Sequence, residues 1–179
     1  MTPDEFRQRF PAFAEIRDDD LDALLGVLET KEVRKGSDII PPNSENRTLY
    51  LIRDGGLRVS LECGGELTVL GDFGPGQWLG EMGMIEPDPV ASVARVSAVE
   101  DSVLLQLSHA DFMALRRTNV SLTSVLLQVF CAALSERLRR TMGLVYDGES
   151  TPDTPGEPKS GWFVEVARQL MGIAARTGT

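Results

Sequence analysis

The sequence predicts a mainly β fold with flanking α-helices, in which short antiparallel strands form a sandwich or barrel. Between Val33 and Leu107, apolar runs alternate with Gly, Pro, Asn and Asp at intervals of about ten residues, which is typical of antiparallel strands and turns. Helical patterns precede this stretch and follow it. The 179 residues, of which 42% are hydrophobic and 25% charged, suit one globular domain with an appendage or two small domains.

Two short helices are predicted ahead of the strands. In the first, over residues 2–9, Thr2 and Glu5 form a capping box and Pro3 takes the first helical position. The second covers residues 19–29, where leucines recur at helical spacing and acidic residues occupy the first turn. We therefore expect the strands to begin at Val33.

Four apolar runs provide the clearest strands. They read LYLI, LRVSL, LTVL and VLLQL, at residues 49–52, 57–61, 67–70 and 103–107. In LRVSL the side chains alternate, so the apolar residues face one side while Arg58 and Ser60 face the other. A hairpin tip is predicted at residues 63–66, because paired glycines adopt positive φ readily.

Helical patterns return after the strands. Ser108 and Asp111 form a capping box for a helix over residues 110–117, and a longer helix covers residues 121–142. The longer helix is apolar around most of its girth, so we expect one stripe to cover the β-core and another to pair with a second copy of the chain. Burial of both stripes, Cys131 included, within one subunit is the alternative. The pairing stripe is Leu127, Cys131, Leu134 and Leu138, and the core stripe is Leu122, Val125, Val129 and Ala133.

Composition changes after a first domain over residues 1–143. Pro, Gly and acidic residues dominate residues 144–160, which we interpret as a flexible linker. Residues 161–179 predict an amphipathic helix whose Trp162 and Leu170 would be unfavourably exposed to water. We expect this helix to dock, either on its own domain or on a partner protein.

Composition and charge exclude several classes of protein. The 18 basic against 27 acidic residues argue against general nucleic-acid binding, which needs clustered Lys and Arg. No apolar run approaches the roughly 20 residues that span a bilayer, and the N-terminus lacks the pattern of a signal peptide. Cys63 and Cys131 are not a disulfide framework, so we expect a cytoplasmic protein. The two cysteines and His109 are too few to suggest a metal site. The sequence also lacks a nucleophile–base set that would indicate an enzyme.

The most informative segment is residues 73–98, FGPGQWLGEMGMIEPDPVASVARVSA. Its Gly80-Glu81-Met82-Gly83 follows a strand and opens what is predicted to be a single helical turn. Glycines let the backbone approach a ligand closely, and the amides at a helix start favour an anion. The carboxylate of Glu81 suits a sugar hydroxyl beside that anion. This segment therefore predicts a phosphate cradle, although these residues also fit a turn retained only for packing.

At this point the sequence resembles the cyclic nucleotide-binding domain of catabolite-activator-type bacterial regulators, kinase regulatory subunits and nucleotide-gated channels. The resemblance covers residues 6–142 and rests on LYLIRDGGLRV, on Gly76-x-x-x-Gly80-Glu81 and on Leu105 to Phe112. It implies an antiparallel, jelly-roll-like β-roll flanked by N-terminal helices, and a long C-terminal helix that serves as dimer and lid helix. It also implies that the amides of Glu81 and Met82 face a cyclic phosphate, while the Glu81 carboxylate binds the ribose 2′-hydroxyl.

One departure from the family's pattern concerns that phosphate. The resemblance places an arginine on the strand after the cradle, and its position in this chain is Val90 or Ser92, depending on how the turn is aligned. Arg58 and Arg95 have the opposite strand parity and are predicted to point out of the roll. Losing one partner of a buried charge pair costs about 2–5 kcal/mol, which is roughly a 30-fold to several-thousand-fold loss of affinity. We therefore predict weak or absent binding of cyclic AMP and cyclic GMP.

These observations predict a non-enzymatic signalling or regulatory module that forms a homodimer and acts through protein contacts. The alternative is a receptor for another nucleotide, such as cyclic di-GMP, and the residues left to contact any nucleotide are Gly80, Glu81, Met82, Gly83, Val90, Ala91 and Ser92. A transcriptional regulator is a lesser alternative. The stretch after Met142 is too short and too acidic to form a helix-turn-helix with a basic recognition helix, so no DNA partner is expected. No membrane partner is expected either, because no apolar run is long enough to span a bilayer.

Overall fold

The computed structural model of the chain describes residues 1–63 and 65–147, and the side chains of residues 1–62 and 65–139. Contacts divide the chain into two units, Met1–Phe130 and Cys131–Thr179. The predicted linker, residues 144–160, is described only as far as Asp147. The predicted tail helix, residues 161–179, lies outside the described residues.

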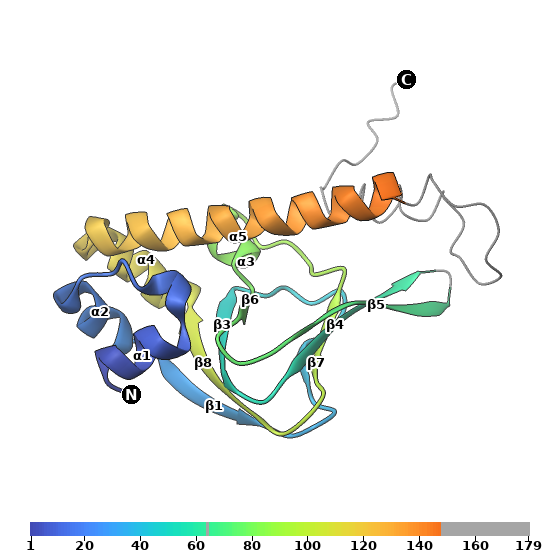
Figure 1. Ribbon diagram of the computed structural model, residues 1–179, viewed down its shortest axis with the longest axis horizontal. Helices are drawn as coiled ribbons and strands as arrows, with labels where there is room; N and C mark the ends of the chain where they lie inside the picture. The colour runs from blue at the N-terminus through green and yellow to red at the C-terminus, as the bar shows by residue number, and fades with distance from the viewer. Residues whose placement is uncertain (64, 148–179) are drawn as a thin grey trace. The chain divides into compact units, whose positions relative to one another are not determined.

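Two four-stranded antiparallel sheets form a β-roll, which confirms the predicted fold class (Figure 1). One sheet has the strand order β1-β8-β3-β6 and the other β2-β7-β4-β5. The strands are β1 Glu29–Val33, β2 Asp38–Ile40, β3 Thr48–Asp54, β4 Leu57–Cys63, β5 Glu66–Phe73, β6 Trp78–Leu79, β7 Arg95–Ala98 and β8 Ser102–Ser108. Each of the four clearest predicted runs lies within one strand.

Three short helical segments precede the strands. They are α1 Pro3–Arg9, the 3-10 turn η1 Pro11–Phe13 and α2 Asp18–Leu25. The capping box predicted for α1 is present, since the Thr2 hydroxyl accepts from the Glu5 amide at 3.3 Å and the Glu5 carboxylate accepts from the Thr2 amide at 2.8 Å. These bonds satisfy two amides that a helix start otherwise leaves without partners.

The second helix is shorter than predicted, because the residues after it join a strand. It ends at Leu25, and Glu29 is the first residue of β1, where it pairs with Gln106 of β8. The Gln106 side chain also donates to the Glu29 carboxylate at 2.8 Å. The strands therefore begin at Glu29 and not at Val33, since the bonds to β8 outweigh the helical spacing of the leucines.

The β4–β5 hairpin agrees with its prediction at the tip and differs from it at Ser60. Gly65 has a φ of +86°, as expected for a glycine in a tight turn. Ser60, which was predicted to face outward with Arg58, is 2% exposed. Its strand is paired on both sides, and the register against β5 shifts between Val59 and Ser60. A side chain this small is covered by its neighbours on both strands, which the alternation of polar residues does not reveal.

Two helices follow the strands, α4 His109–Thr118 and α5 Val120–Asp147. Ser108 caps α4 as predicted, because its hydroxyl accepts from the Asp111 amide at 3.1 Å. The predicted long helix is confirmed, although α5 starts earlier and ends later than residues 121–142.

The face of α5 that packs on the core is formed by Leu122, Leu126 and Phe130, each at most 1% exposed. Of these, Leu126 and Phe130 were not in the stripe predicted for this role. Val125 and Val129 of that stripe are partly buried against the same cluster. Because apolar residues surround most of this helix, their spacing alone does not select the buried face.

The stripe predicted to pair with a second copy is mostly exposed. Leu127 is 36% and Leu138 47% exposed, Cys131 is exposed and Leu134 is half-buried. Burial of Cys131 within one chain is therefore wrong, while pairing with a second copy stays a prediction. By length and composition alone, Val120–Arg139 is also long and apolar enough to cross a membrane, a test that core helices pass as well.

Both faces of β3 are buried, which explains its uninterrupted apolar run. Leu49 and Leu51 join a cluster that includes side chains of α1, α2, α4 and α5. Tyr50 and Ile52 join a second cluster between the two sheets. Successive side chains of a strand point to opposite faces, so one strand serves both clusters. The helices on one side and the roll on the other therefore share β3.

Candidate functional site

The predicted single helical turn is present directly after β6. α3 spans Met82–Ile85, and Glu81 precedes it with helical backbone angles. Two amide-to-carbonyl bonds of 3.1 and 3.0 Å close the turn. We call residues 80–83 together with α3 the cradle. The Glu81 side chain is 1% exposed, so a carboxyl group lies buried at the start of this turn.

The glycines of the cradle approach the chain's own backbone. A Cβ on Gly80, whose φ is +94°, would lie 2.2 Å from the Thr48 carbonyl oxygen. A Cβ on Gly83 would lie 1.9 Å from the Asn46 carbonyl oxygen. Any side chain at these positions would force the cradle away from residues 46–48. The two glycines are thus explained by packing, without invoking the close approach of a ligand.

The two methionines of the cradle have different environments. Met84 is 2% exposed and belongs to the cluster around the N-terminal helices. Met82 is 44% exposed and Ile85, three residues later, 40% exposed. The spacing of Met82 and Ile85 alone would equally suit packing inside the roll, but both side chains lie on the outer face of the turn, which residues three apart on a helix share.

Residues 87–94, which we call the wall segment, contain the position where the family pattern has an arginine. Val90 is 56% exposed, and Ala91 is exposed and forms a bridge with Glu45. Ser92 is half-buried, and its hydroxyl donates to the Ala94 carbonyl at 2.8 Å. The Ser92 carbonyl accepts from the amide of Asn43, which adopts a left-handed conformation with a φ of +59°. The wall segment therefore offers no cation, and the Ser92 hydroxyl proton is already in use.

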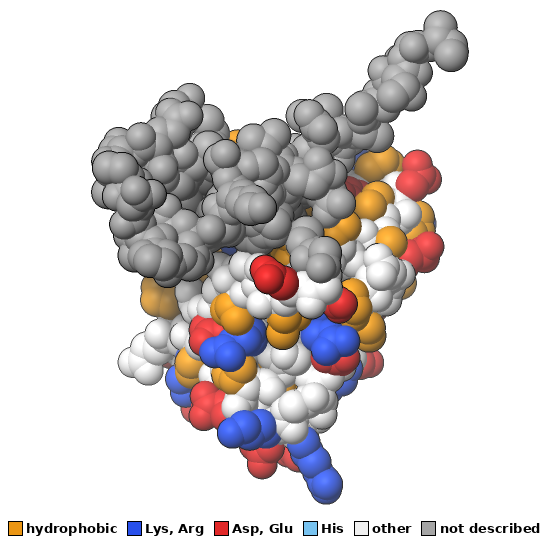
Figure 2. Space-filling model, turned by 90° about the vertical axis from the view of Figure 1, so that its right-hand side faces the viewer, with side chains coloured by type: hydrophobic (Ala, Val, Ile, Leu, Met, Phe, Trp, Pro, Cys, Tyr) orange, Lys and Arg blue, Asp and Glu red, His pale blue; other side chains and the backbone are white. Residues whose placement is uncertain are grey.

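The two arginines on neighbouring strands lie at the surface, as predicted. Arg58 makes two hydrogen bonds of 2.7 Å to Asp72, and these bonds hold the pKa of Asp72 below its usual value. Arg95 lies 3.8 Å from Asp38. Figure 2 shows basic and acidic side chains beside one another on the face that it presents, without a broad basic patch there. Such pairs leave little positive potential for an anionic ligand.

One cation that the sequence analysis missed does contact the cradle. The Arg47 Nη2 donates to the Glu86 carbonyl, directly after α3, at 3.0 Å, and it also contacts Nε2 of His109. Arg47 precedes an apolar strand, where a charged residue is ordinarily solvated, so nothing in the sequence pattern marks it. Its Nη2 is thus engaged at the end of the cradle helix.

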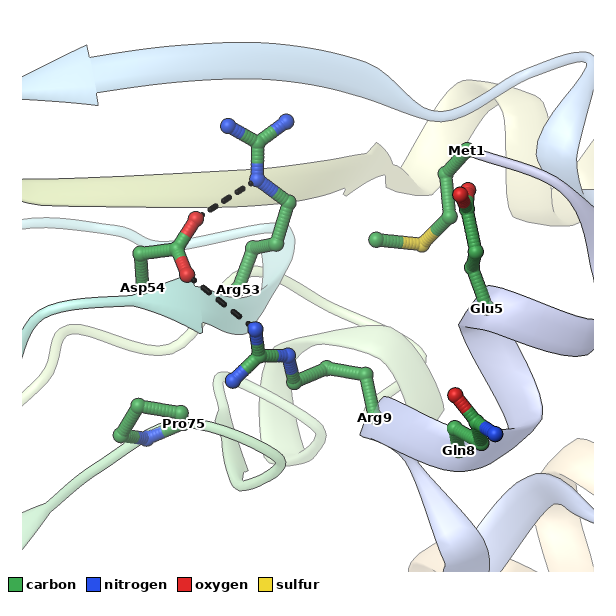
Figure 3. Close-up of a pocket in the computed structure, with 7 residues that line it drawn as sticks. All are labelled: Met1, Glu5, Gln8, Arg9, Arg53, Asp54 and Pro75. Carbon is green, nitrogen blue, oxygen red and sulfur yellow. Dashed lines mark hydrogen bonds and ion pairs between the residues drawn. The ribbon is translucent and has the colours of Figure 1, made fainter.

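A cavity of about 780 Å³ lies on another part of the first unit (Figure 3). There Asp54 accepts from Nη2 of Arg9 at 3.3 Å and from Nε of Arg53 at 2.9 Å. The pair of Arg9 with Asp54 ties α1 to the end of β3, while Arg53 and Asp54 are neighbours within that strand. The lining contains no cradle residue and comprises Met1, Glu5, Gln8, Arg9, Arg53, Asp54 and Pro75. No pattern in the sequence predicts this cavity.

Metal ligands do not gather in the described part of the chain. Within residues 1–63 and 65–147, no group of three or more His, Cys, Asp or Glu side chains could hold a metal ion. Of the three adjacent acids that open α2, Asp20 is bound by Arg17 and Asn119 at 3.0 and 2.7 Å. These bonds fit the interpretation of the acids as a helix start.

Comparison with known proteins identifies relatives of this arrangement. The sequence model of the cyclic nucleotide-binding domain family matches residues 30–119 of the 179. The cyclic AMP receptor protein of Thermus thermophilus is 31% identical over 108 residues, which cover 60% of this chain and 49% of that protein. The chain therefore spans about half the length of that curated relative.

Solved structures of similar proteins share the fold, among them the following two. The catabolite activator protein of Thermus thermophilus is 28% identical, with a TM-score of 0.65 over 78% of this chain and 63% of that one. The regulatory domain of Toxoplasma gondii protein kinase A, solved with cyclic AMP, is 25% identical, with a TM-score of 0.54 over 62% of this chain and 41% of that one. The similar proteins are regulators or receptors in kind, and one of them holds cyclic AMP.

Proposed function

Because this chain belongs to the cyclic nucleotide-binding domain family, we propose that it is a non-enzymatic regulatory module whose cradle binds cyclic AMP and cyclic GMP weakly or not at all. It then acts through protein contacts. The observation that carries the proposal is the wall segment, where Val90, Ala91 and Ser92 are uncharged and the Ser92 hydroxyl is bound to a carbonyl. The surface arginines are committed to carboxylates, and Arg47 Nη2 to the end of α3.

The size of the missing interaction makes the proposal testable. A bound phosphate that lacks its guanidinium partner loses about 2–5 kcal/mol, roughly 30-fold to several-thousand-fold in affinity. Calorimetric titration of the full chain with cyclic AMP should therefore give no low-micromolar binding. Ser92→Arg and Val90→Arg, made separately, should include one variant that gains at least about 30-fold.

Ser92→Lys is the matched control, since a lysine supplies the charge without the two-pronged donor geometry and should gain less. Thermal unfolding of each variant shows whether it remains folded. Low-micromolar binding of cyclic AMP by the unaltered chain would contradict the proposal. So would two folded arginine variants that bind no better than the parent.

A receptor for another nucleotide, such as cyclic di-GMP, is the second candidate. It is supported by Glu81, which is buried directly before α3 and to which the family resemblance gives the ribose contact. A ligand that binds only the folded state raises stability by RT ln(1 + [L]/Kd), so a thermal-shift series should rise with dose. The series should include cyclic di-GMP, cyclic AMP and cyclic GMP. No shift with any of them favours the protein-contact module.

The proposal extends to assembly and location. The exposed stripe of Leu127, Cys131, Leu134 and Leu138 supports a homodimer through α5. We also propose that the module acts in the cytoplasm. Sedimentation equilibrium should give a dimer, and Leu127→Glu with Leu138→Glu a monomer. Residues 161–179 are proposed to bind the partner protein.

A transcriptional regulator is the lesser candidate, suggested by the catabolite activator among the similar proteins. A gel shift at low salt distinguishes it, because sequence-specific DNA binding would assign the chain to that class.

A further inference from the structure

Arg47 joins the cradle to helix α4. Its Nη2 donates to the carbonyl of Glu86, and Glu86 is the residue that caps the end of α3. The same nitrogen contacts Nε2 of His109, the first residue of α4. The His109 amide in turn donates to the Arg47 carbonyl at 2.9 Å. One residue therefore binds both the end of the cradle helix and the start of the next helix.

The cradle also rests on the backbone of this residue's neighbours. A Cβ on Gly83 would lie 1.9 Å from the Asn46 carbonyl oxygen and 3.5 Å from the Arg47 Cα. Interfaces packed this closely move together or rearrange, because they leave no space to deform gradually. A displacement of α3 is therefore expected either to move Arg47 with it or to rearrange the contact between Arg47 and His109.

The contact between Arg47 and His109 requires a neutral imidazole. A guanidinium group only donates hydrogen bonds, so Nε2 must carry a lone pair and Nδ1 the ring proton. Protonation would put a donor on Nε2 and bring two cations into contact. Burial and, to a smaller extent, the charge on Arg47 lower the pKa of His109 below the usual 6.5.

The other titratable groups around this contact are carboxyl groups. On the cradle side, burial raises the pKa of Glu86, and Arg47 opposes that shift. On α4 itself, Asp111 accepts a hydrogen bond from the Ser108 hydroxyl. From the segment before β3, the charge that acts on His109 is Arg47. The protonation state of His109 is therefore set by its burial and by Arg47.

We propose that Arg47 and His109 form a proton-sensitive link between the cradle and α4, closed while His109 is neutral and opened when His109 gains a proton. The inference deepens the proposed function and rests on it for the role of α3 as a cradle. It needs no bound nucleotide, because each contact is within the chain. Since α4 is followed directly by α5, the link lies between the cradle and the long helix.

His109 is the single histidine of the chain, so its titration can be followed without assignment. NMR of the imidazole in the full, nucleotide-free chain should give a midpoint below 6.5 and the Nδ1–H tautomer at neutral pH. Arg47→Met should raise the midpoint, because the neighbouring cation is gone. Arg95→Met, which removes an exposed arginine paired with Asp38, is the matched control and should leave it unchanged. A midpoint at or above 6.5, or one that Arg47→Met does not move, overturns the link.

Hydrogen exchange of the Glu86 amide, which donates to the Met82 carbonyl at 3.0 Å, reports the state of α3. Below the His109 midpoint its protection should fall by roughly tenfold beyond the intrinsic change of rate, as expected on losing one charge-assisted hydrogen bond. His109→Gln keeps a hydrogen-bond acceptor but cannot be protonated at these pH values. In this variant, protection of the Glu86 amide should therefore not change as pH falls through the His109 midpoint. Protection that is unchanged in the parent chain, or falls equally in the variant, overturns the proposal.

The two proposals fail separately. The titration and exchange experiments use the chain without nucleotide, so tight cyclic AMP binding would contradict the proposed function and leave the link intact. Conversely, an ordinary His109 midpoint would remove the link without altering the expected effect of Ser92→Arg.

Discussion

The N-terminal aromatic cluster and the cradle are held in place by different interactions. Phe6, Phe10 and Phe13 are fully buried, with ring centroids 4.9 Å apart for the first pair and 5.8 Å for Phe6 and Phe13. The cradle adds Met84 to that cluster, but its position is otherwise set by glycines pressed against a neighbouring backbone and by Arg47. Burial of side chains therefore holds the aromatic cluster in place, whereas main-chain contacts and the hydrogen bond from Arg47 hold the cradle.

We expect the two regions to contribute to different properties, the first to the stability of the fold and the second to how the cradle responds to protons and ligands. Apolar burial contributes about 25 cal/mol per Å² and does not depend on pH, so the aromatic cluster should dominate the free energy of unfolding. A contact through one arginine and one histidine is weaker and depends on protonation. We therefore expect substitutions in the first region to change stability most, and those in the second to change the geometry and ligand response of the cradle.

The largest effect is expected for Phe10→Ala. The ring is 0% exposed and packs against Phe6 and Phe13, so its removal leaves a cavity as well as losing transfer energy. Urea unfolding should show a loss of about 3–5 kcal/mol. A loss below about 1 kcal/mol would mean that this cluster collapses around the cavity and does not dominate stability.

The next effect tests the main-chain contact of the cradle. Gly83→Ala places a methyl group where the Asn46 carbonyl oxygen lies 1.9 Å away, so the cradle must shift. Overpacking of this kind costs about 1–3 kcal/mol, measured by urea unfolding.

Gly74→Ala is the matched control for this contact. It meets no atom within 4 Å and does not require a positive φ, so it should be neutral or slightly stabilising. Equal costs for the two alanines would show that the close contact is not what positions the cradle.

The sequence predicts the fold well because local patterns determine it. Period-two alternation marks β4, and the capping residues Thr2 and Ser108 mark two helices, since each signal acts over a few residues. The same local rules fail at Glu29, which joins β1 because it pairs with Gln106 of the distant strand β8. They also fail at Leu126 and Phe130, whose burial depends on which elements α5 packs against.

The cradle is only half visible in the sequence. Its turn and its glycines are predicted, but their role in packing against residues 46–48 is not, because that contact joins segments distant in the chain. Arg47 gives no signal at all, since its partners Glu86 and His109 are brought to it by folding. Local chemistry is therefore predictable, while the contacts that position it are not.

Because burial of the aromatic cluster does not depend on pH, the pH dependence of stability should come from titratable groups such as Asp20 and His109. Hydrogen bonds from Arg17 and Asn119 hold the pKa of Asp20 below 3.8. A carboxyl group with a lowered folded pKa stabilises the fold above its unfolded pKa, and that contribution is lost as pH falls through the folded value. His109, whose folded pKa is also lowered, follows the same sign but begins to lose its contribution below 6.5.

Unfolding free energies between pH 2.5 and 8 should therefore separate two variants. Asp20→Asn should flatten the dependence below pH 3.8 and His109→Gln the dependence that begins at 6.5. Identical profiles for the two variants would mean that neither group contributes in its own region.

The smallest effect is expected at the wall segment. Val90 is 56% exposed, so Val90→Ser removes little buried apolar surface and should change the free energy of unfolding by less than about 0.5 kcal/mol. The Val90→Ser variant should also bind cyclic AMP as weakly as the parent chain, because a serine carries no positive charge to pair with the phosphate. Urea unfolding and calorimetric titration of the same preparation measure both. A loss of stability approaching that of Phe10→Ala would show that the wall segment packs as tightly as the aromatic cluster, and the contrast between side-chain burial in one region and main-chain contact in the other would no longer hold.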